Sequence, residues 1–434
     1  MLQTLINALK VKDIRRKVIL MLLLLLVFRI GCFIPVPGLG REFFAEAISE
    51  NDFLTLMSSI TGGALSQGTV FALGIGPYIN ASIIIQLLCV GIPALERLSK
   101  QGEEGRKKIA QITRYVTILL AVLQSTGIII AYGGEEGVIR ADLFFNQAWL
   151  AGVFMVLVYT AGAFIVMWLG ERITDLGVGN GQSMIIFVGI LATAADTILG
   201  VIGRISTDTS AIWELVAFAL VCAVIFFAII YVDLSERKVP VQYAKQIKGR
   251  KMYGGQSSAI PIRISGGGVM PLIFAFSILS FPQMIASMVA PDGGFAKWWA
   301  RWMSASATDG RAIVYTLVLC LLIFAFSFFY AQMQFNPEDV SRSIQQNGGF
   351  IHGIRPGKAT EAYLKKISNR ITLFGAIYLS LIAFIPSVAF AWAGYSLVNA
   401  FSTTGILIVV SCAMEFDKQL QAQLMMKNHK GFLK

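Results

Sequence analysis

Long runs of apolar residues alternate with shorter polar segments along nearly the whole chain. A membrane-spanning helix needs about 20 predominantly apolar residues, and this ruler finds ten candidate spans. They occupy residues 18–35, 69–90, 111–132, 148–169, 183–203, 213–233, 267–290, 312–333, 371–393 and 402–422. The pattern predicts an all-α membrane protein in which an even number of spans brings both termini to the same side.

The predicted spans form two sets of five, and an odd set size inverts the second half relative to the first. The resulting divisions are an amphipathic N-terminus at 1–17, an N-terminal half at 18–203, a C-terminal half at 213–422 and a tail at 423–434. Two segments between spans, about 234–266 and 334–370, are much longer than the two to eight residues that usually join packed helices. We expect them to form structured surfaces on which a large partner docks.

Residues 53–88 follow the first span but do not form one clean span of their own. The amphipathic piece at 53–60 would be about 12 Å long as a helix, well under half of a hydrocarbon core of about 30 Å. Two glycines follow at 62–63, and glycines and a proline interrupt the next apolar run at 74–77. Irregular backbone survives at membrane depth only where protein or a water-filled cavity satisfies its hydrogen-bonding groups. The stretch therefore predicts a half-helix folded into a cavity inside the membrane.

A second interrupted segment, at 266–271, opens the seventh span with three glycines and a proline. The seventh span corresponds to the second if the chain is two sets of five. Paired interruptions in two inverted halves indicate a functional pathway at their interface. The alternative is that these glycines only allow neighbouring helices to pack closely.

The basic residues are concentrated in the N-terminal segment and in the loops after spans 2, 6 and 8, whereas the opposite loops carry many acids. By the positive-inside rule both termini are expected to be cytoplasmic. The net charge of +11 then reflects topology and attraction to anionic lipids. For the two long loops it also favours a partner rich in phosphate or acidic groups.

Catalytic, nucleotide-binding and metal-binding motifs are missing from the sequence, so we predict a non-enzyme without cofactor or metal. The five cysteines lie in or beside apolar segments, which favours small buried side chains over disulfides. The glycine-rich segment at 177–181 is predicted to be a tight turn with Asn180 near the cap of the next helix. Arg29 lies in the outer part of the first span, where its side chain can snorkel toward the interface.

The spans carry almost no ionisable groups near their centres, which argues against a proton-coupled or ion-coupled transporter of the inverted-repeat type. An intramembrane enzyme would need a nucleophile and a base, and the sequence offers no such pair. The centres are aliphatic instead, with isoleucines at 75, 79, 185, 186, 273 and 408. A ring of such residues would form a constriction that excludes water and ions by dewetting, although aliphatic residues also fill the centres of ordinary spans.

Several segments in order along the chain resemble the SecY family, the central channel subunits of the bacterial Sec protein-translocation complex. They are FALGIGPYINASIIIQLL at 71–88, EEGRKKIAQITRY at 103–115, GNGQSMIIF at 179–187, RKVPVQYAK at 237–245, GRKMYGGQS at 249–257, GVMPLIFA at 268–275 and GIRPG at 353–357. The resemblance implies an hourglass pore between two five-helix halves, hinged after span 5 and opening sideways to lipid. The implied function is a passive conduit for secretory polypeptides.

The resemblance also assigns site residues. The pore ring is expected at Ile75, Ile79, Ile186, Ile273 and Ile408, with Gln182 at a further ring position that leaves the ring incompletely apolar. The plug maps to about 53–65, and its named residues are Phe53, Leu54, Leu56, Met57, Ile60, Gly62, Gly63 and Leu65. The lateral gate lies between spans 2–3 and 7–8, with polar positions at Gln86, Asn180 and Ser265, the last where the family often has Asn.

The family's long cytoplasmic loops receive the SecA motor ATPase or the ribosome. Arg355 matches an arginine tied to motor-driven translocation, although a role in contacting phosphate or in ordering the loop stays open. Arg250 and Lys251 match basic residues at the tip of the other loop. The further partners that the resemblance implies are SecE and SecG as complex subunits, signal sequences and nascent chains, and the implied location is the bacterial plasma membrane.

Overall fold

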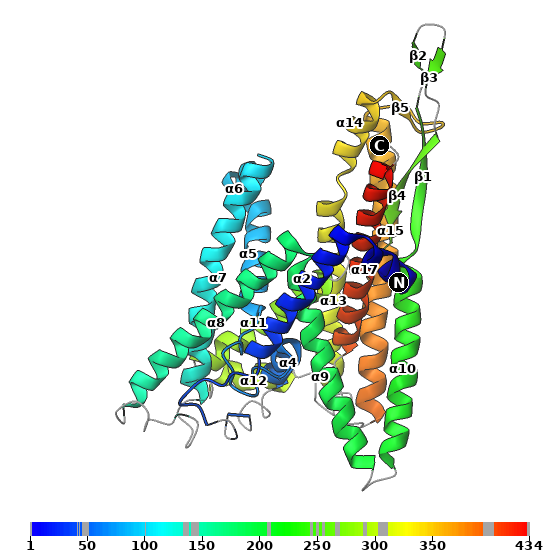
Figure 1. Ribbon diagram of the computed structural model, residues 1–434. Helices are drawn as coiled ribbons and strands as arrows, with labels where there is room; N and C mark the ends of the chain where they lie inside the picture. The colour runs from blue at the N-terminus through cyan, green and yellow to red at the C-terminus, as the bar shows by residue number, and fades with distance from the viewer. Residues whose placement is uncertain are drawn as a thin grey trace.

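A computed structural model shows a chain that is mostly helical, with long helices packed into one bundle and a β-sheet projecting from one end (Figure 1). The structure describes residues 2–40, 42, 44–45, 52–99, 101–132, 139, 147–205, 210–243, 246–248, 251–253, 257–264, 270–289, 293–302, 311–393 and 403–431.

Every one of the ten predicted spans overlaps a helix. These helices are α2 (Lys12–Gly31), α5 (Gly76–Gly91), α7 (Glu103–Tyr132), α8 (Ala148–Leu176), α9 (Gly181–Ile205), α10 (Ser210–Asp233), α11 (Met270–Val289), α13 (Arg311–Gln334), α15 (Lys358–Ala393) and α17 (Thr403–Gly431). Shorter helices are α1 (Leu2–Lys10), α4 (Asp52–Thr61), α6 (Pro93–Ser99), α12 (Gly294–Trp302) and α14 (Pro337–Gln346). Within the described residues, five helices are long and apolar enough to cross a membrane. The number is six if α5 and α6, which meet at a bend of 105°, form one broken span.

The boundaries of several helices differ from those that apolar length predicts. Helix α15 begins at Lys358, well before the predicted start at 371, and α7 begins at Glu103 instead of 111. The added turns are polar, with ion pairs between residues four apart such as Lys107–Glu103. Such pairs stabilise an exposed helix, so the helices continue beyond the apolar segment that a hydropathy ruler detects.

The expectation of an all-α chain omits a small β-sheet formed by the two long loops. Strand β1 (Glu236–Tyr243) pairs antiparallel with β4 (Ser257–Arg263) and with β5 (Gly349–Phe350), which comes from the other long loop. At the tip, β2 (Gln246–Lys248) pairs with β3 (Lys251–Tyr253). Val239 and Val241 point into a small apolar core while their neighbours on β1 are exposed, as a sheet with one covered face requires.

Three large apolar clusters hold the bundle together. One is formed by residues of the N-terminal helices α4, α7 and α8, and another by residues of α10, α11, α13, α15 and α17. The third lies between them and takes residues from α2, α8 and α9 on one side and from α11 and α17 on the other. In Figure 1, α5 to α8 stand on the left and α10, α15 and α17 on the right, with α2 and α9 between them. This central cluster is therefore the place where the two parts of the chain meet.

Candidate functional site

The irregular stretch at 53–88 is a short helix, a glycine turn and then a long helix, as its sequence predicts. Helix α4 ends in a left-handed turn at Gly62 and Gly63, with φ of 72° and 81°. The Gly63 N–H donates to Ser58 O at 2.8 Å and the Gly62 N–H to Ser59 O at 3.3 Å, which is the Schellman arrangement for a helix end. The glycines that interrupt the apolar pattern therefore end the half-helix.

Helix α4 packs against α9. A side chain on Gly189 of α9 would overlap the carbonyl of Ile60, so the two backbones touch at this point. Leu54 and Leu65 are buried in the N-terminal cluster, Met57 packs against it, and Ile60 packs against the central cluster. The side chains of the other two predicted plug residues, Phe53 and Leu56, lie outside the described part of the structure.

The long helix of this stretch begins just after Ile75. Helix α5 starts at Gly76 with Pro77 in its first turn, a position where the missing N–H of proline is tolerated. Ile75 is the N-cap residue, and its carbonyl accepts the Ile79 N–H at 3.1 Å. The two isoleucines are thus linked by the first helical hydrogen bond, as residues four apart should be.

All five isoleucines expected in the ring belong to one apolar neighbourhood. Ile75, Ile186, Ile273 and Ile408 are buried members of the central cluster, and Ile79 packs against it. They come from α5 and its N-cap and from α9, α11 and α17, helices that are far apart in the sequence. The structure therefore brings together the isoleucines that the resemblance assigns to the ring. They meet at the junction of the two parts of the bundle.

Gln182 lies in the first turn of α9, close to this cluster. A side chain on Gly170 would stand 3.3 Å from Gln182 Cγ and 3.5 Å from Ile75 Cδ1, so both side chains border the same point. The Gln182 side chain also lies within reach of the Tyr78 hydroxyl of α5. The amide is therefore engaged with a neighbouring helix and does not stand as an isolated polar group beside the isoleucines.

Gln86 forms a direct contact between the two groups of helices. The Tyr330 hydroxyl of α13 donates to Gln86 Oε1 of α5 at 2.7 Å, and Gln86 Nε2 donates to Ser82 Oγ at 3.0 Å. The Tyr330 ring stacks on Phe274 of α11, with centroids 4.7 Å apart. Tyr330 was missed in the sequence, because an aromatic residue near the end of a span is common and only the fold shows what it faces.

The other two polar positions expected at the gate are less informative. Asn180 caps α9, as predicted, since its Oδ1 accepts the Gln182 N–H at 3.0 Å. This bond lies within the start of α9 and does not connect Asn180 to the gate helices. The role of Asn180 at the gate therefore stays a prediction. Ser265 lies outside the described residues.

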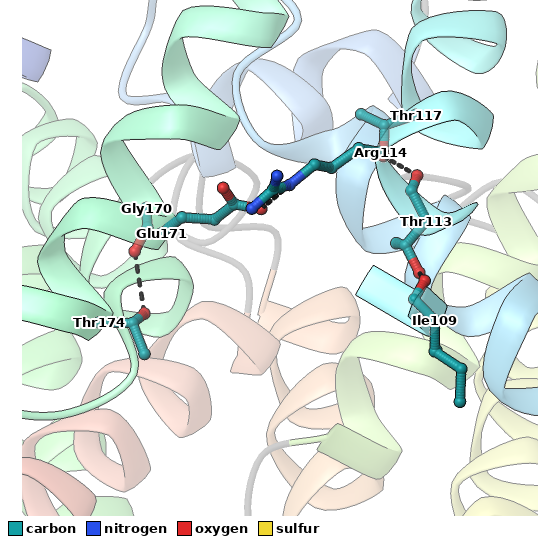
Figure 2. Close-up of polar contacts among 7 residues, drawn as sticks. All are labelled: Ile109, Thr113, Arg114, Thr117, Gly170, Glu171 and Thr174. Carbon is teal, nitrogen blue, oxygen red and sulfur yellow. Dashed lines mark hydrogen bonds and ion pairs between the residues drawn. The ribbon is translucent and has the colours of Figure 1, made fainter. Parts of the chain in front are cut away.

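The turn before α9 is also tied to α8. The Thr174 hydroxyl donates to Gly170 O and accepts the Gly181 N–H, both at 2.9 Å. On the same helix, Glu171 accepts a hydrogen bond from Arg114 Nε of α7 at 2.8 Å (Figure 2). These contacts fix α7, α8 and α9 relative to one another at the level of the turn.

The expected docking residues lie on the two long loops that share the sheet. Arg355 is exposed in the turn before α15, and its carbonyl accepts the Thr360 hydroxyl at 2.9 Å. Lys251 begins β3 and pairs with Lys248 across the hairpin, whereas Arg250 lies outside the described residues. The pairing of β1 with β5 therefore joins the two loops that carry these residues.

Known proteins share both the sequence and the fold of this chain. The SecY family model matches residues 69–416. The protein translocase subunits SecY of Streptomyces coelicolor and Mycobacterium tuberculosis are 40% and 39% identical to it, with 100% of this chain and 100% of each relative covered.

Solved structures give the same answer for the fold. A protein-conducting channel covers 94% of this chain and 92% of its own length, with a TM-score of 0.67 and 20% identity. The canine Sec61 chain from a ribosome-channel complex covers the same shares, with a TM-score of 0.65 and 19% identity. Since the family model spans most of the sequence and the relatives match its full length, this chain belongs to the SecY family.

Proposed function

We propose that this chain is the protein-conducting channel of a bacterial plasma membrane. It moves secretory polypeptides across the membrane and releases apolar segments sideways into lipid. The observation that carries this proposal is the gathering of five isoleucines from four helices into one cluster beside the half-helix α4. Its relatives are protein translocase subunits, and a similar fold forms a protein-conducting channel.

The physical problem is to move a polar peptide through hydrocarbon. Each unsatisfied backbone group costs several kcal/mol there, and a charged side chain at the centre costs about 3 kcal/mol. A narrow channel removes most of this cost because the peptide no longer meets lipid. An aliphatic ring closes around the chain without binding it, since isoleucine offers no hydrogen bond to any passing side chain.

In this proposal ten helices cross the membrane in two inverted sets of five, with both termini cytoplasmic. The residues at 53–65 form the plug, which blocks the resting pore outside the isoleucine ring. A solved SecY structure with a TM-score of 0.68 concerns a plug domain that stabilises the closed state and maintains a membrane seal. Helix α4 suits this role because it is too short to span the membrane and is packed inside the bundle.

The lateral gate lies between α5 and α7 on one side and α11 and α13 on the other. Gln86 and Tyr330 meet across this boundary with one neutral hydrogen bond. An apolar segment that separates the two sides can leave the channel by partitioning into lipid. The polar contact closes behind it.

The driving force comes from partners, because the sequence holds no energy-converting motif. The exposed Arg355 and the β2–β3 hairpin with Lys251 form the surface that receives the SecA motor or the ribosome, and SecE and SecG complete the complex. The Sec61 relative from a ribosome-channel complex supports the ribosome as a partner. Anionic lipids attract the same basic face.

A reconstitution experiment tests the function. Vesicles that contain this chain with SecE should, on addition of SecA, ATP and a secretory precursor, protect the precursor from added protease. Vesicles without ATP are the control, and a known channel in parallel vesicles shows that the assay works. Absence of protection beside a working control channel would refute the proposal.

The plug assignment has its own test. Deletion of residues 53–65 should raise the resting ion conductance of the reconstituted channel, because the half-helix no longer fills the pore. The full chain in the same bilayer gives the baseline. Equal conductances would remove the plug role while leaving translocation untouched.

The docking assignment is tested by charge reversal at Arg355. Arg355→Glu should slow SecA-driven translocation without loss of the assembled complex, because its side chain is exposed and its fold contact is a backbone carbonyl. Lys358→Glu, which reverses the charge of an exposed lysine at the start of α15, serves as the matched reversal. Wild-type rates in Arg355→Glu would leave this arginine with a structural role only.

A further inference from the structure

The C-terminal end of α4 is held by side chains from two other helices. The carbonyl of Ser59 accepts the hydroxyl of Thr193 on α9 at 3.0 Å. The carbonyl of Gly62 accepts Arg29 Nη1 of α2 at 3.2 Å. Cys32, just after α2, points its thiol at Thr61 O at 4.0 Å. The last turn of the half-helix therefore meets donors from its surroundings.

Arg29 is the ionisable residue that the first span carries, and the structure uses it differently from what the sequence suggests. Instead of snorkelling to the interface, the side chain reaches inward to α4 and is partly buried. Its guanidinium also lies over the Phe33 ring, 5.2 Å from the centroid, in a cation–π contact. An ionisable residue within a membrane-spanning segment is rare, so a specific partner for it indicates a function.

The electrostatics of this contact favour the docked half-helix. The carbonyls at the end of a helix carry partial negative charge, and a cation there stabilises the helix. The hydrogen bond from a charged donor adds to this effect and is stronger than a neutral one. When α4 leaves its site, Arg29 loses both contributions at once.

The glycine at the end of α4 makes room for the contact. Gly62 has φ of 72°, and a side chain at this position would overlap Arg29 Nη1. Glycine is therefore required here for the left-handed turn, and its lack of a side chain leaves room for the guanidinium.

We propose that Arg29 and Thr193 form a clamp that holds the plug in its closed position and so sets the resting permeability of the channel. The clamp binds the carbonyls of the Schellman turn and releases them when the plug is displaced. This inference rests on the proposed channel function and names the residues that regulate its resting state. Arg29 and Thr193 act here as positioning residues, since they touch the plug and not the translocated polypeptide.

Resting ion conductance of the reconstituted complex, measured without precursor or motor, tests the clamp. Arg29→Met removes the charge and the donor but keeps an unbranched apolar side chain. We expect the resting conductance to rise about ten-fold, since a charge-assisted hydrogen bond is lost only from the closed state. Thr193→Val, which removes one neutral hydroxyl and keeps the shape, should raise it about three-fold.

Two further variants separate a clamp from a general loss of structure. Arg29→Lys keeps the cation near the helix end. Its resting conductance should therefore lie between that of the wild type and that of Arg29→Met. Arg172→Met is the matched control, since Arg172 also lies over an aromatic ring, 5.5 Å from the Trp168 centroid, but is exposed on α8. Its conductance should equal that of the wild type.

The outcomes are separable from those of the plug test. Unchanged conductance in both Arg29→Met and Thr193→Val, beside a raised conductance in the 53–65 deletion, would refute the clamp and keep the plug. If Arg29→Met does not assemble, Thr193→Val decides, because a valine is tolerated in a helix in place of threonine. Equal increases in Arg29→Met and Arg172→Met would also overturn the proposal.

Discussion

Helices in the C-terminal part of the bundle are joined by stronger polar contacts than the helices that meet across the proposed gate. Lys418 Nζ of α17 donates to Asp233 Oδ2 of α10 at 2.7 Å and to the Asp233 carbonyl at 2.9 Å. Between α5 and α13 the contact described above is one neutral bond, from Tyr330 to Gln86. One junction is built with charges and the other with neutral groups.

A second pair of helices in the C-terminal part repeats the pattern of multiple bonds. On α13 and α15, Ser380 Oγ donates to Cys320 O at 3.2 Å, and Cys320 Sγ lies 3.4 Å from Ser380 O. The same helix α13 thus makes a reciprocal pair of contacts with α15 and the Tyr330–Gln86 bond with α5. If the boundary with α5 opens as proposed, we expect α13 to move together with α15.

The largest effect is expected where the charged junction is broken. Lys418→Met removes the cation facing a carboxylate that is only 13% exposed. Removing one partner of this half-buried pair should lower the free energy of unfolding by about 3 kcal/mol, measured by thermal denaturation in detergent.

The matched control is Lys108→Met, which breaks an exposed pair with Glu104. It should change the free energy of unfolding by less than about 0.5 kcal/mol. Equal losses in both variants would show that the charged junction has no special strength.

The next largest effect is expected where α4 packs against α9 in the N-terminal part, because the α9 residue at this contact is a glycine, Gly189. Gly189→Ala places a methyl group against the Ile60 carbonyl of α4, and such overpacking should cost about 2 kcal/mol. Because α4 would be pushed from α9, the resting conductance should rise together with the loss of thermal stability. Gly200→Ala on the same helix meets no atom within 4 Å and should be neutral or slightly stabilising. A neutral Gly189→Ala would contradict the close packing of α4.

A smaller effect is expected at the gate itself. Tyr330→Phe removes the hydroxyl but keeps the ring on Phe274, so about 1 kcal/mol should be lost from the closed state. A precursor with a less apolar signal segment should then be translocated about five-fold faster. Tyr159→Phe is the control, since its buried hydroxyl has no hydrogen-bond partner within the described residues. Unchanged rates for Tyr330→Phe would mean that the neutral bond does not hold the gate.

The smallest effect is expected at the pair of Figure 2. Arg114 is 47% exposed where it meets Glu171, so water screens the charges. Arg114→Gln should lower the free energy of unfolding by about 0.5 kcal/mol, with translocation unchanged. A loss of stability as large as that of Lys418→Met would contradict the expectation that a less exposed ion pair contributes more to the free energy of unfolding.

Much of this architecture follows from local sequence signals. The ten apolar ranges all overlap helices, because a segment of that length and composition has few alternatives in a membrane. Gly62, Gly63 and Pro77 predict the end of one helix and the start of another through their own backbone restrictions. Asn180 predicts a helix cap by the same kind of local chemistry.

Contacts between distant segments could not be read in the same way. The sheet combines β1 with β5, more than a hundred residues later, and short strands within long polar loops leave little periodicity to detect. The bonds of Arg29 to Gly62 and of Tyr330 to Gln86 depend on how helices pack, which neither residue encodes alone. The resemblance to the SecY family identified the isoleucines of the ring, whereas the residues that pack around them are seen only in the fold.

Helix α15 gives the molecule a mechanical property. Ahead of Pro386, Lys358–Ile385 form one helical run of 28 residues, about 42 Å at 1.5 Å per residue. Its exposed end follows the turn of Arg355, which Thr360 and Ser341 tie down through the carbonyls of Arg355 and Gly357. A helix of this length is stiff, so a displacement of its exposed end also displaces the residues further along it. A push by a partner at Arg355 would therefore reach Ser380 and, through it, the gate helix α13 as a movement of the whole helical run.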